Sequence, residues 1–195
     1  KYPSPADLPP GAVVGTASLR RGAMLKRLRP DVAVALLRGN VGTRLDKVKA
    51  GEFDATLLAL AGLRRLGLAD RATSALDTRD FLPAVAQGAI GVTTRVGDAA
   101  TMAKLAPILH ADSTIAVTAE RAFLRVLDGS CRTPIGGHAT VSGGVLAFRG
   151  MVLKPDGSQA FECDAGGDAG QAAAIGEAAG HDLLRRMPAD LFTTT

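Results

Sequence analysis

Two short segments combine small residues with arginine where an apolar run gives way to a helical pattern. They are GTASLRR at residues 15–21 and LRGNVGTR at residues 37–44. Backbone N–H groups at a helix N-terminus hold anions, and guanidinium groups bind carboxylate or phosphate through paired hydrogen bonds. The pattern therefore predicts an anion site, or else two capped helices whose arginines are solvated. Neither segment has the Gly-Lys-Ser/Thr of a P-loop or the glycine fingerprint of a dinucleotide site.

A cysteine lies in a glycine- and proline-containing loop, DGSCRTPIGG at residues 128–137. The neighbouring Arg132 favours the thiolate of Cys131, which is the reactive form of the side chain. From residue types alone, a buried structural thiol remains the alternative. Cys163 lies inside an expected strand, where packing explains it. The cysteines and the three histidines lack the spacing of a zinc site, so no metal is expected.

Composition limits the possible partners. The net charge is only +4, aromatic residues make up 4% and tryptophan is absent, which argues against a basic nucleic-acid-binding module. No apolar run is long enough to cross a membrane, and the first residues lack a secretory signal. Two cysteines far apart in the sequence suit a reducing compartment, so a cytoplasmic location is expected.

Apolar runs and helical periods alternate in the first part of the chain. Strands are expected at residues 12–15, 32–37 and 55–60, and helices at about 18–28 and 43–50, with a short helix that holds Arg64 and Arg65. This alternation favours an α/β layer with a parallel sheet. Because such sheets bind ligands at the carboxyl ends of their strands, both arginine turns are expected at that edge.

The pattern changes in the second part of the chain. A helix is expected at residues 113–127, with Gly129 as its stop, followed by strands at 138–141, 145–153 and 159–163 and a helix at about 170–187. Strong turn signals separate the strands, so this part predicts a small α+β domain with a three-stranded antiparallel sheet. Between the two parts, residues 89–94 suggest a strand and residues 99–108 a helix.

These segments, in this order, resemble the porphobilinogen deaminase (hydroxymethylbilane synthase) family. The matching stretches are GTASLRR, LRGNVGTRLDKV, FDATLLALAGLRRLGL, LPAVAQGAIGV, TAERAFLR and DGSCRTPIGGHA. The similarity runs from about Leu8 to the end. Ala86 and Ser130 depart from the family, which usually has glycine at both positions.

The resemblance implies a domain order and a fold. Residues 1–85 would form the second domain of the family, an α/β domain similar to periplasmic binding proteins. Residues 86–110 would return to the first domain, most of which is absent from this chain. Residues 111–195 would form the C-terminal, cofactor-carrying α+β domain. The family's catalytic aspartate belongs to the first domain, so no catalytic residue is expected here.

The resemblance also implies an activity. The family links four porphobilinogen molecules into hydroxymethylbilane with release of ammonia, and it starts the chain on a dipyrromethane cofactor joined by a thioether to the loop cysteine, here Cys131. By resemblance, the residues that would bind this cofactor are Cys131, Thr16, Ser18, Arg20, Arg21, Arg44, Gly39, Asn40, Gln87 and Gly88. Arg38 and Arg65 would bind the incoming substrate or the growing chain.

The resemblance implies that the partners are porphobilinogen, its oligopyrrole intermediates and the missing N-terminal domain. It also implies that the complete enzyme is a monomer and that this chain alone is inactive. From the residues, a non-enzymatic anion- or solute-binding α/β module is the alternative, although such a module has no need of a loop cysteine or of the strands that follow it.

Overall fold

Three short parallel strands form the first sheet of the computed structural model, which describes residues 2–129, 133–188 and 191. They are β1 (Val13–Gly15), β2 (Ala33–Ala35) and β3 (Ala55–Thr56), in the order β2-β1-β3. The parallel sheet is as the apolar runs predict. β2 is shorter and less buried than expected, because it is an edge strand with β1 as its one neighbour in the described chain.

Each strand of this sheet leads into a helix. They are α1 (Leu19–Leu28), α2 (Val41–Lys49) and α3 (Leu60–Arg65). The Ser18 side chain accepts from the Arg21 N–H at the start of α1, and Asn40 Oδ1 accepts from the Thr43 N–H at 2.9 Å. Such caps satisfy N–H groups that have no partner within the helix. Because Asn40 is the cap, α2 begins two residues earlier than expected.

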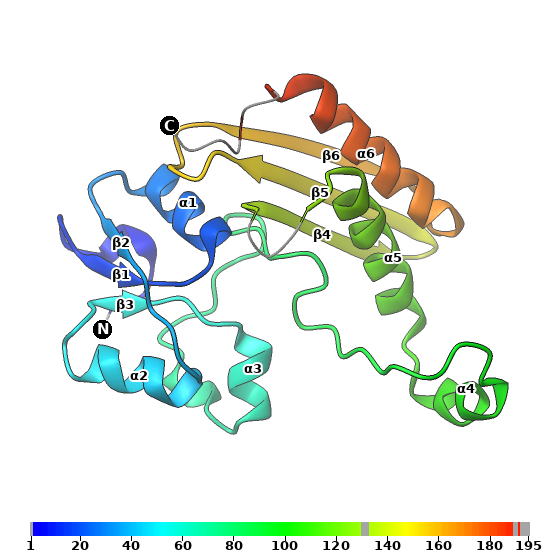
Figure 1. Cartoon of the computed structure of the whole chain (residues 1–195), viewed down its shortest axis with the longest axis horizontal. Coiled ribbons are helices and arrows are strands. Elements are labelled where there is room, and N and C mark those ends of the chain that lie inside the picture. Colours follow the sequence, from blue (N-terminus) through cyan, green and yellow to red (C-terminus); the bar gives the residue numbers. More distant parts are fainter. Residues whose placement is uncertain (1, 130–132, 189–190, 192–195) are drawn as a thin grey trace.

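Residues 66–110, which follow α3, form a segment with little regular structure. It holds short 3-10 turns at Ala69–Arg71 and Ala106–Ile108 and one helix, α4 (Ala99–Leu105). A further 3-10 turn precedes β1 at Pro5–Asp7. The strand expected at residues 89–94 is wrong, because no strand of the described chain lies beside this segment to receive its backbone hydrogen bonds. Figure 1 shows α4 and its flanking loops standing away from both sheets.

The second sheet is an antiparallel meander of β4 (Ile135–Ser142), β5 (Val145–Leu153) and β6 (Ala160–Asp168). This confirms the three-stranded sheet, and the whole is a mixed α/β fold. β4 begins three residues earlier and β6 ends five residues later than expected, since β4 pairs with β5 from Val145 to Val152 and β6 pairs with β5 over its full length. The final helix, α6 (Ala172–Arg186), consequently begins later, after a 3-10 turn at Ala169–Gln171.

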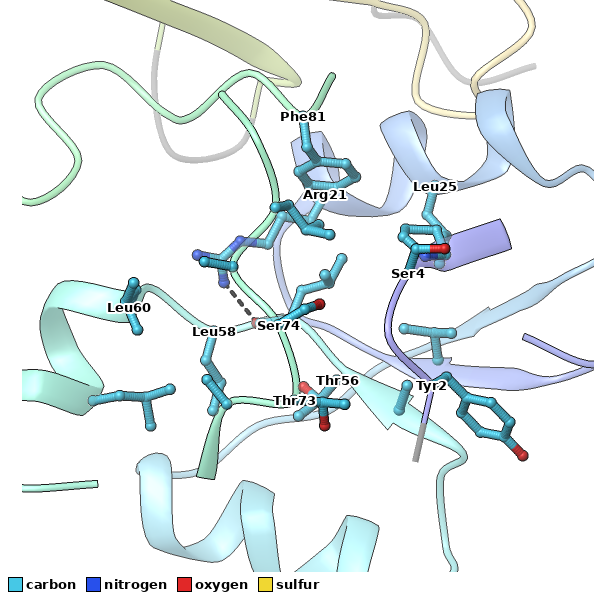
Figure 2. A pocket seen from close by; sticks show the side chains of 18 of the residues that line it. Tyr2, Ser4, Arg21, Leu25, Thr56, Leu58, Leu60, Thr73, Ser74 and Phe81 are labelled. Atoms are coloured by element: carbon cyan, nitrogen blue, oxygen red, sulfur yellow. Dashed lines mark hydrogen bonds between the residues drawn. The ribbon is translucent and has the colours of Figure 1, made fainter. Parts of the chain in front are cut away.

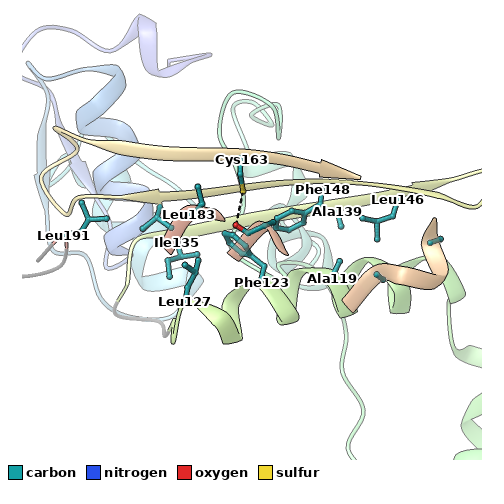
Figure 3. Close-up of a cluster of buried hydrophobic side chains, with 14 residues drawn as sticks. Ala119, Phe123, Leu127, Ile135, Ala139, Leu146, Phe148, Cys163, Leu183 and Leu191 are labelled. Atoms are coloured by element: carbon teal, nitrogen blue, oxygen red, sulfur yellow. Dashed lines mark hydrogen bonds between the residues drawn. The ribbon is translucent and has the colours of Figure 1, made fainter. Parts of the chain in front are cut away.

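Side chains of β5 alternate between two cores. Leu146, Phe148 and Val152 point to the face covered by α5 (Ala111–Val126) and α6, where they join Phe123 in a large apolar cluster (Figure 3). The other face carries Met151 and Leu153, which pack with α1 and with Leu82. Successive side chains of a strand point to opposite faces, so this one strand serves both parts of the molecule. α1 therefore lies between the two sheets (Figure 1).

Glycines allow α5 and α6 to approach closely. A Cβ atom on Gly176 would stand 2.0 Å from the carbonyl oxygen of Ala119, and one on Gly180 would stand 2.7 Å from the Val126 Cβ. These glycines are four residues apart and so lie on the same face of α6. The contact between the helices is thus made backbone against backbone.

The end of α5 differs in detail from the sequence pattern. Asp128, not Gly129, adopts the left-handed conformation, with φ of 48°, and the Gly129 N–H donates to the Leu124 carbonyl at 3.0 Å. This is a Schellman ending, in which the residue two beyond the cap bonds back to the third-last helical carbonyl. Gly129 is needed for space, because a Cβ there would stand 2.3 Å from Leu124 Cδ1.

Among the residues that the structure describes, no helix is both long enough and apolar enough to cross a membrane.

Candidate anion-binding site

Arg20 is a buried arginine in the first turn of α1, with 5% of its surface exposed. Its Nη1 donates to the Leu82 carbonyl and lies 3.5 Å from Met24 Sδ, and its Nη2 lies 3.5 Å from Gln87 Oε1. Burial, and then the neighbouring Arg21 cation, lower the pKa of the Arg20 guanidinium to about 10. Arg20 therefore fixes the segment around Leu82 and keeps its charge at neutral pH.

Arg21 is half-buried and points into a cavity of about 420 Å³ (Figure 2). Its Nη1 donates to the Leu57 carbonyl at 2.9 Å, and its Nη2 donates to Gln87 Oε1 at 3.3 Å. Burial first, and the Arg44 cation second, lower the pKa of Arg21 below its ordinary value. The rest of the lining is largely apolar and includes Leu58, Leu60 and Leu63. The cavity thus combines arginine side chains with largely apolar walls, as sites for small molecules commonly do, and its lining also includes Asp54 and Arg71.

Arg44 stands in the first turns of α2, close enough for its charge to act on Arg21. Its Nε donates to the Gly39 carbonyl at 2.8 Å. Gly39 has φ of +120°, a conformation that favours glycine, and a Cβ there would press on Thr43. Gly39 and Asn40 were predicted to bind the cofactor; in the structure the Gly39 carbonyl holds the Arg44 side chain, and the Asn40 side chain caps α2.

The two arginine turns are thus brought together at the carboxyl ends of neighbouring strands. The Thr16 N–H donates to the Ala35 carbonyl at 2.9 Å, which continues the pairing of β1 with β2. Thr16 Oγ1 also accepts from the Ser18 N–H at 3.1 Å. Thr16 and Ser18 therefore shape the first turn. Arg38 and Arg65 are exposed, and neither lines the cavity.

Gln87 belongs to a tight turn between the two sheets. The Gln87 N–H donates to the Ala84 carbonyl at 3.0 Å, and the Ala89 N–H donates to the Ala86 carbonyl at 3.1 Å. Ala86 has φ of 56° and Gly88 has φ of 91°. Ala86 is therefore in the left-handed region, which glycine adopts more readily than alanine.

Ala86→Gly is expected to raise the free energy of unfolding by about 0.5 kcal/mol. Glycine avoids the conformational energy that alanine has at positive φ, and this gain is larger than the stability lost because glycine increases the entropy of the unfolded chain. Urea denaturation measures the change. Ala178→Gly is the matched control: it lies on the exposed side of α6 and should lower the same free energy by about 1 kcal/mol. A loss at Ala86 as large as that at Ala178 would contradict the expectation.

Glu120 is a buried acidic residue that the sequence patterns did not assign to the site. It lies in the middle of α5 and is 5% exposed. Its Oε2 accepts from the Ala86 N–H at 2.6 Å, and its Oε1 accepts from the Ala139 N–H at 2.8 Å. His138 Nδ1 stands 3.6 Å from Oε1. Glu120 therefore joins the Gln87 turn to α5 and β4.

Cys131 lies outside the described residues, but the strand that follows its loop is placed. The Gly137 N–H donates to the Pro83 carbonyl at 3.0 Å, and a Cβ on Gly136 would contact Leu82. The start of β4 is thus beside the segment that Arg20 binds. Cys163 is buried, its Sγ is 3.8 Å from the Ala179 carbonyl (Figure 3), and burial raises the pKa of its thiol to about 11.

Comparison with known proteins gives one family. A family model described as "Porphobilinogen deaminase, dipyromethane cofactor binding domain" matches residues 1–103, and one described as "Porphobilinogen deaminase, C-terminal domain" matches residues 114–185. Among curated relatives, the porphobilinogen deaminases of Nitrobacter hamburgensis and Nitrobacter winogradskyi are each 54% identical over 187 residues, or 96% of this chain and 59% of the relative. That of Syntrophobacter fumaroxidans is 50% identical over 179 residues, or 92% of this chain and 58% of the relative. The chain spans less than two thirds of the length of these relatives, and it belongs to the porphobilinogen deaminase family.

Proposed function

We propose that this chain is the part of a porphobilinogen deaminase that binds the anionic pyrrole chain and carries its primer on Cys131. The complete enzyme would join four porphobilinogen molecules into hydroxymethylbilane and release ammonia at each addition. Family membership and the cationic site favour this function. A non-enzymatic anion-binding module has nothing in its favour beyond the same arginines.

One observation carries the proposal: the Arg20 and Arg21 guanidinium groups meet at the Gln87 Oε1 oxygen, and neither has a carboxylate partner in the described chain. Arg20 and Arg21 are adjacent, and the Arg44 charge lowers the pKa of Arg21. In the described part of the chain, none of the three makes a salt bridge. Like charges at close range destabilise one another, and a bound anion relieves this repulsion. The site is therefore built to be completed by a negatively charged ligand.

The chemistry of the residues fits a dipyrromethane group. Each pyrrole of this group carries an acetate and a propionate, which match planar guanidinium donors, and its rings match the apolar walls of leucine side chains. Arg21 and Arg44 would bind the carboxylates, while Arg20 holds the turn in place from beneath. When bound, the cofactor supplies the pyrrole carbon to which each new unit is added.

Cys131 would provide the sulfur that anchors this group. Attachment would replace the amino group of a porphobilinogen-type unit: the C–N bond would break, a C–S bond would form, and the proton given up by the thiol would leave with the nitrogen as ammonia. Arg132 follows Cys131 in the sequence and favours the thiolate that this step needs.

The chain would divide at residues 85 and 110, as the sequence predicts. Residues 86–110 would pack on a domain that this chain does not contain. In support, large apolar side chains of this segment are open to solvent, with Ile90 80% and Ile108 69% exposed. A run of exposed apolar residues marks a surface that another body covers. The likeness of residues 1–85 to periplasmic binding proteins and the cytoplasmic location remain parts of the proposal.

The test replaces Arg21 by glutamine, which keeps a hydrogen-bonding group but removes the charge. It uses a complete polypeptide, in which this chain is joined to a segment that corresponds to the region of its relatives outside the matched residues. Loss of a charge-assisted hydrogen bond to a carboxylate is expected to lower kcat/KM for hydroxymethylbilane formation by about 10- to 100-fold. The rate is followed by the absorbance of the oxidised product.

Arg125→Gln is the matched control for this experiment. Arg125 lies on α5 with its side chain 73% exposed and makes only a 3.8 Å surface pair with Glu177, so its loss should leave the rate unchanged. Equal rates in the two variants would contradict the anion site, and a wild-type polypeptide that forms no hydroxymethylbilane would contradict the proposed function itself.

A further inference from the structure

We infer that Glu120 is a positioning residue of the anion site, because it fixes the turn from which Gln87 orients Arg20 and Arg21. This role rests on the proposed function, since it concerns how the same arginine pair is held. Glu120 comes from a different part of the molecule than the arginines it would serve. It lies in α5, which packs on the antiparallel sheet, whereas the arginines follow β1 of the parallel sheet.

The carboxylate of Glu120 is used on both oxygens. Oε2 accepts from the Ala86 N–H, and Oε1 accepts from the Ala139 N–H, with distances of 2.6 and 2.8 Å. A buried carboxylate is costly to desolvate, and within the described chain the only basic group that pairs with it is His138. Hydrogen bonds from two backbone N–H groups offset that cost and make this carboxylate a fixed link between two segments.

The Glu120 carboxylate is connected to the two arginines through Gln87. Ala86 precedes Gln87, whose Oε1 accepts from Arg21 Nη2 at 3.3 Å and lies 3.5 Å from Arg20 Nη2. Ala86 is held in the left-handed conformation, so its N–H needs a strong acceptor to keep the turn in this shape. Among the described residues, Glu120 is the acceptor for the Ala86 N–H, so without it the turn would shift and the Gln87 oxygen would lose its position between the two guanidinium groups.

The same carboxylate also reaches the strand that follows the Cys131 loop. Ala139 lies in β4, whose first residues contact Leu82 and Pro83. Glu120 thus fixes the position of the turn that orients the arginines relative to the strand that follows the cysteine loop.

The decisive variant is Glu120→Gln in the complete polypeptide. A glutamine has one acceptor oxygen and one NH₂ group, so it cannot accept from both N–H groups and must present a donor to one of them. We expect KM for porphobilinogen to rise about tenfold because the Gln87 turn is no longer fixed, and the unfolding temperature to fall by a few degrees because a buried N–H has lost its acceptor. Glu177→Gln is the control. The Glu177 side chain lies on α6, is 48% exposed and pairs with Arg125 rather than with the turn.

A double-mutant cycle separates positioning from general damage to the fold. If Glu120 acts through Gln87, then Gln87→Ala should raise KM to a similar degree, and the double variant should be no worse than Gln87→Ala alone. Multiplied effects in the double variant, or an unchanged KM in Glu120→Gln, would overturn the inference.

A second measurement does not depend on activity. In a protein labelled with ¹⁵N-glutamine, the side-chain amide signal of Gln87 should shift in Glu120→Gln and stay in place in Glu177→Gln. An unshifted signal would overturn the inference even in an active enzyme. A wild-type enzyme without turnover would refute the proposed function, and the amide signal would still decide the role of Glu120.

Discussion

Replacing Cys131 by alanine is expected to abolish covalent attachment of dipyrromethane, so that the intact mass of the complete polypeptide equals the mass calculated from its sequence. The thioether needs a sulfur atom, and alanine offers none. The wild-type protein, prepared in the presence of porphobilinogen, should carry the extra mass of two pyrrole units. Activity should fall to the background, since no primer is held for elongation.

Cys163→Ala is the matched control, because both variants remove one thiol. Cys163 is buried among the side chains beneath the antiparallel sheet, and burial raises the pKa of its thiol to about 11. At neutral pH it is almost entirely protonated, and a thiol is a poor nucleophile compared with its thiolate. The Cys163→Ala protein should therefore keep the full added mass. Added mass retained in Cys131→Ala, or lost in Cys163→Ala, would show that the anchor has been assigned to the wrong sulfur.

The second large effect concerns the fold that carries this cysteine. Gly176→Ala is expected to lower the free energy of unfolding by about 2 to 3 kcal/mol. The free-energy cost of the steric clash is larger than the roughly 1 kcal/mol of stability that alanine gains over glycine in a helix. The new Cβ would stand 2.0 Å from the Ala119 carbonyl oxygen and 2.9 Å from its carbon. Both atoms belong to the backbone of α5, so a rotamer change cannot relieve the contact and the helices must separate.

Urea denaturation followed by circular dichroism measures this loss. Gly62→Ala in α3 provides the comparison, because a Cβ on Gly62 meets nothing within 4 Å and the substitution should stabilise the chain slightly. A Gly176→Ala protein as stable as Gly62→Ala would mean that α5 and α6 do not pack as closely as the structure shows.

The order of strands and helices could be predicted from the sequence because local signals agree with the fold. Ser18 and Asn40 are strong helix caps at the ends of apolar runs, and the turns between the antiparallel strands contain glycine at the required positions. The three strands of each sheet were found for this reason.

The boundaries that were missed depend on groups with no strong local preference. α5 begins at Ala111 after His110, whose ring Nδ1 accepts from the Ser113 N–H, although the helix was expected to begin at residue 113. At the other end, Asp128 takes the left-handed position while Gly129 supplies the space. The extension of β6 into glycine-rich sequence comes from its pairing with β5, which overrides the weak strand preference of those residues.

The sequence indicated the two arginine turns as candidate anion sites, but it did not indicate the contacts that hold their side chains. Arg20, Arg21 and Gln87 lie within a few ångströms of one another, yet the sequence could not show that Arg20 would be buried against the Leu82 carbonyl. Glu120 did leave a signal. It occupies the face of α5 that also carries Ala119 and Phe123, and a carboxylate on an apolar face needs internal partners. Which backbone groups would meet it depends on how α5 packs against β4 and the Gln87 turn.

Because the two faces of β5 pack in different cores, insertions and deletions within this strand should be excluded in this family. A single residue inserted or deleted in the middle of β5 would turn every later side chain to the opposite face. Met151 would be moved into the core under α5 and α6, and Val152 towards α1, so both halves of the molecule would be damaged by one event. We therefore expect the number of residues between the turns at Ser142–Gly144 and Pro155–Gly157 to be invariant among relatives, even where the side chains themselves differ.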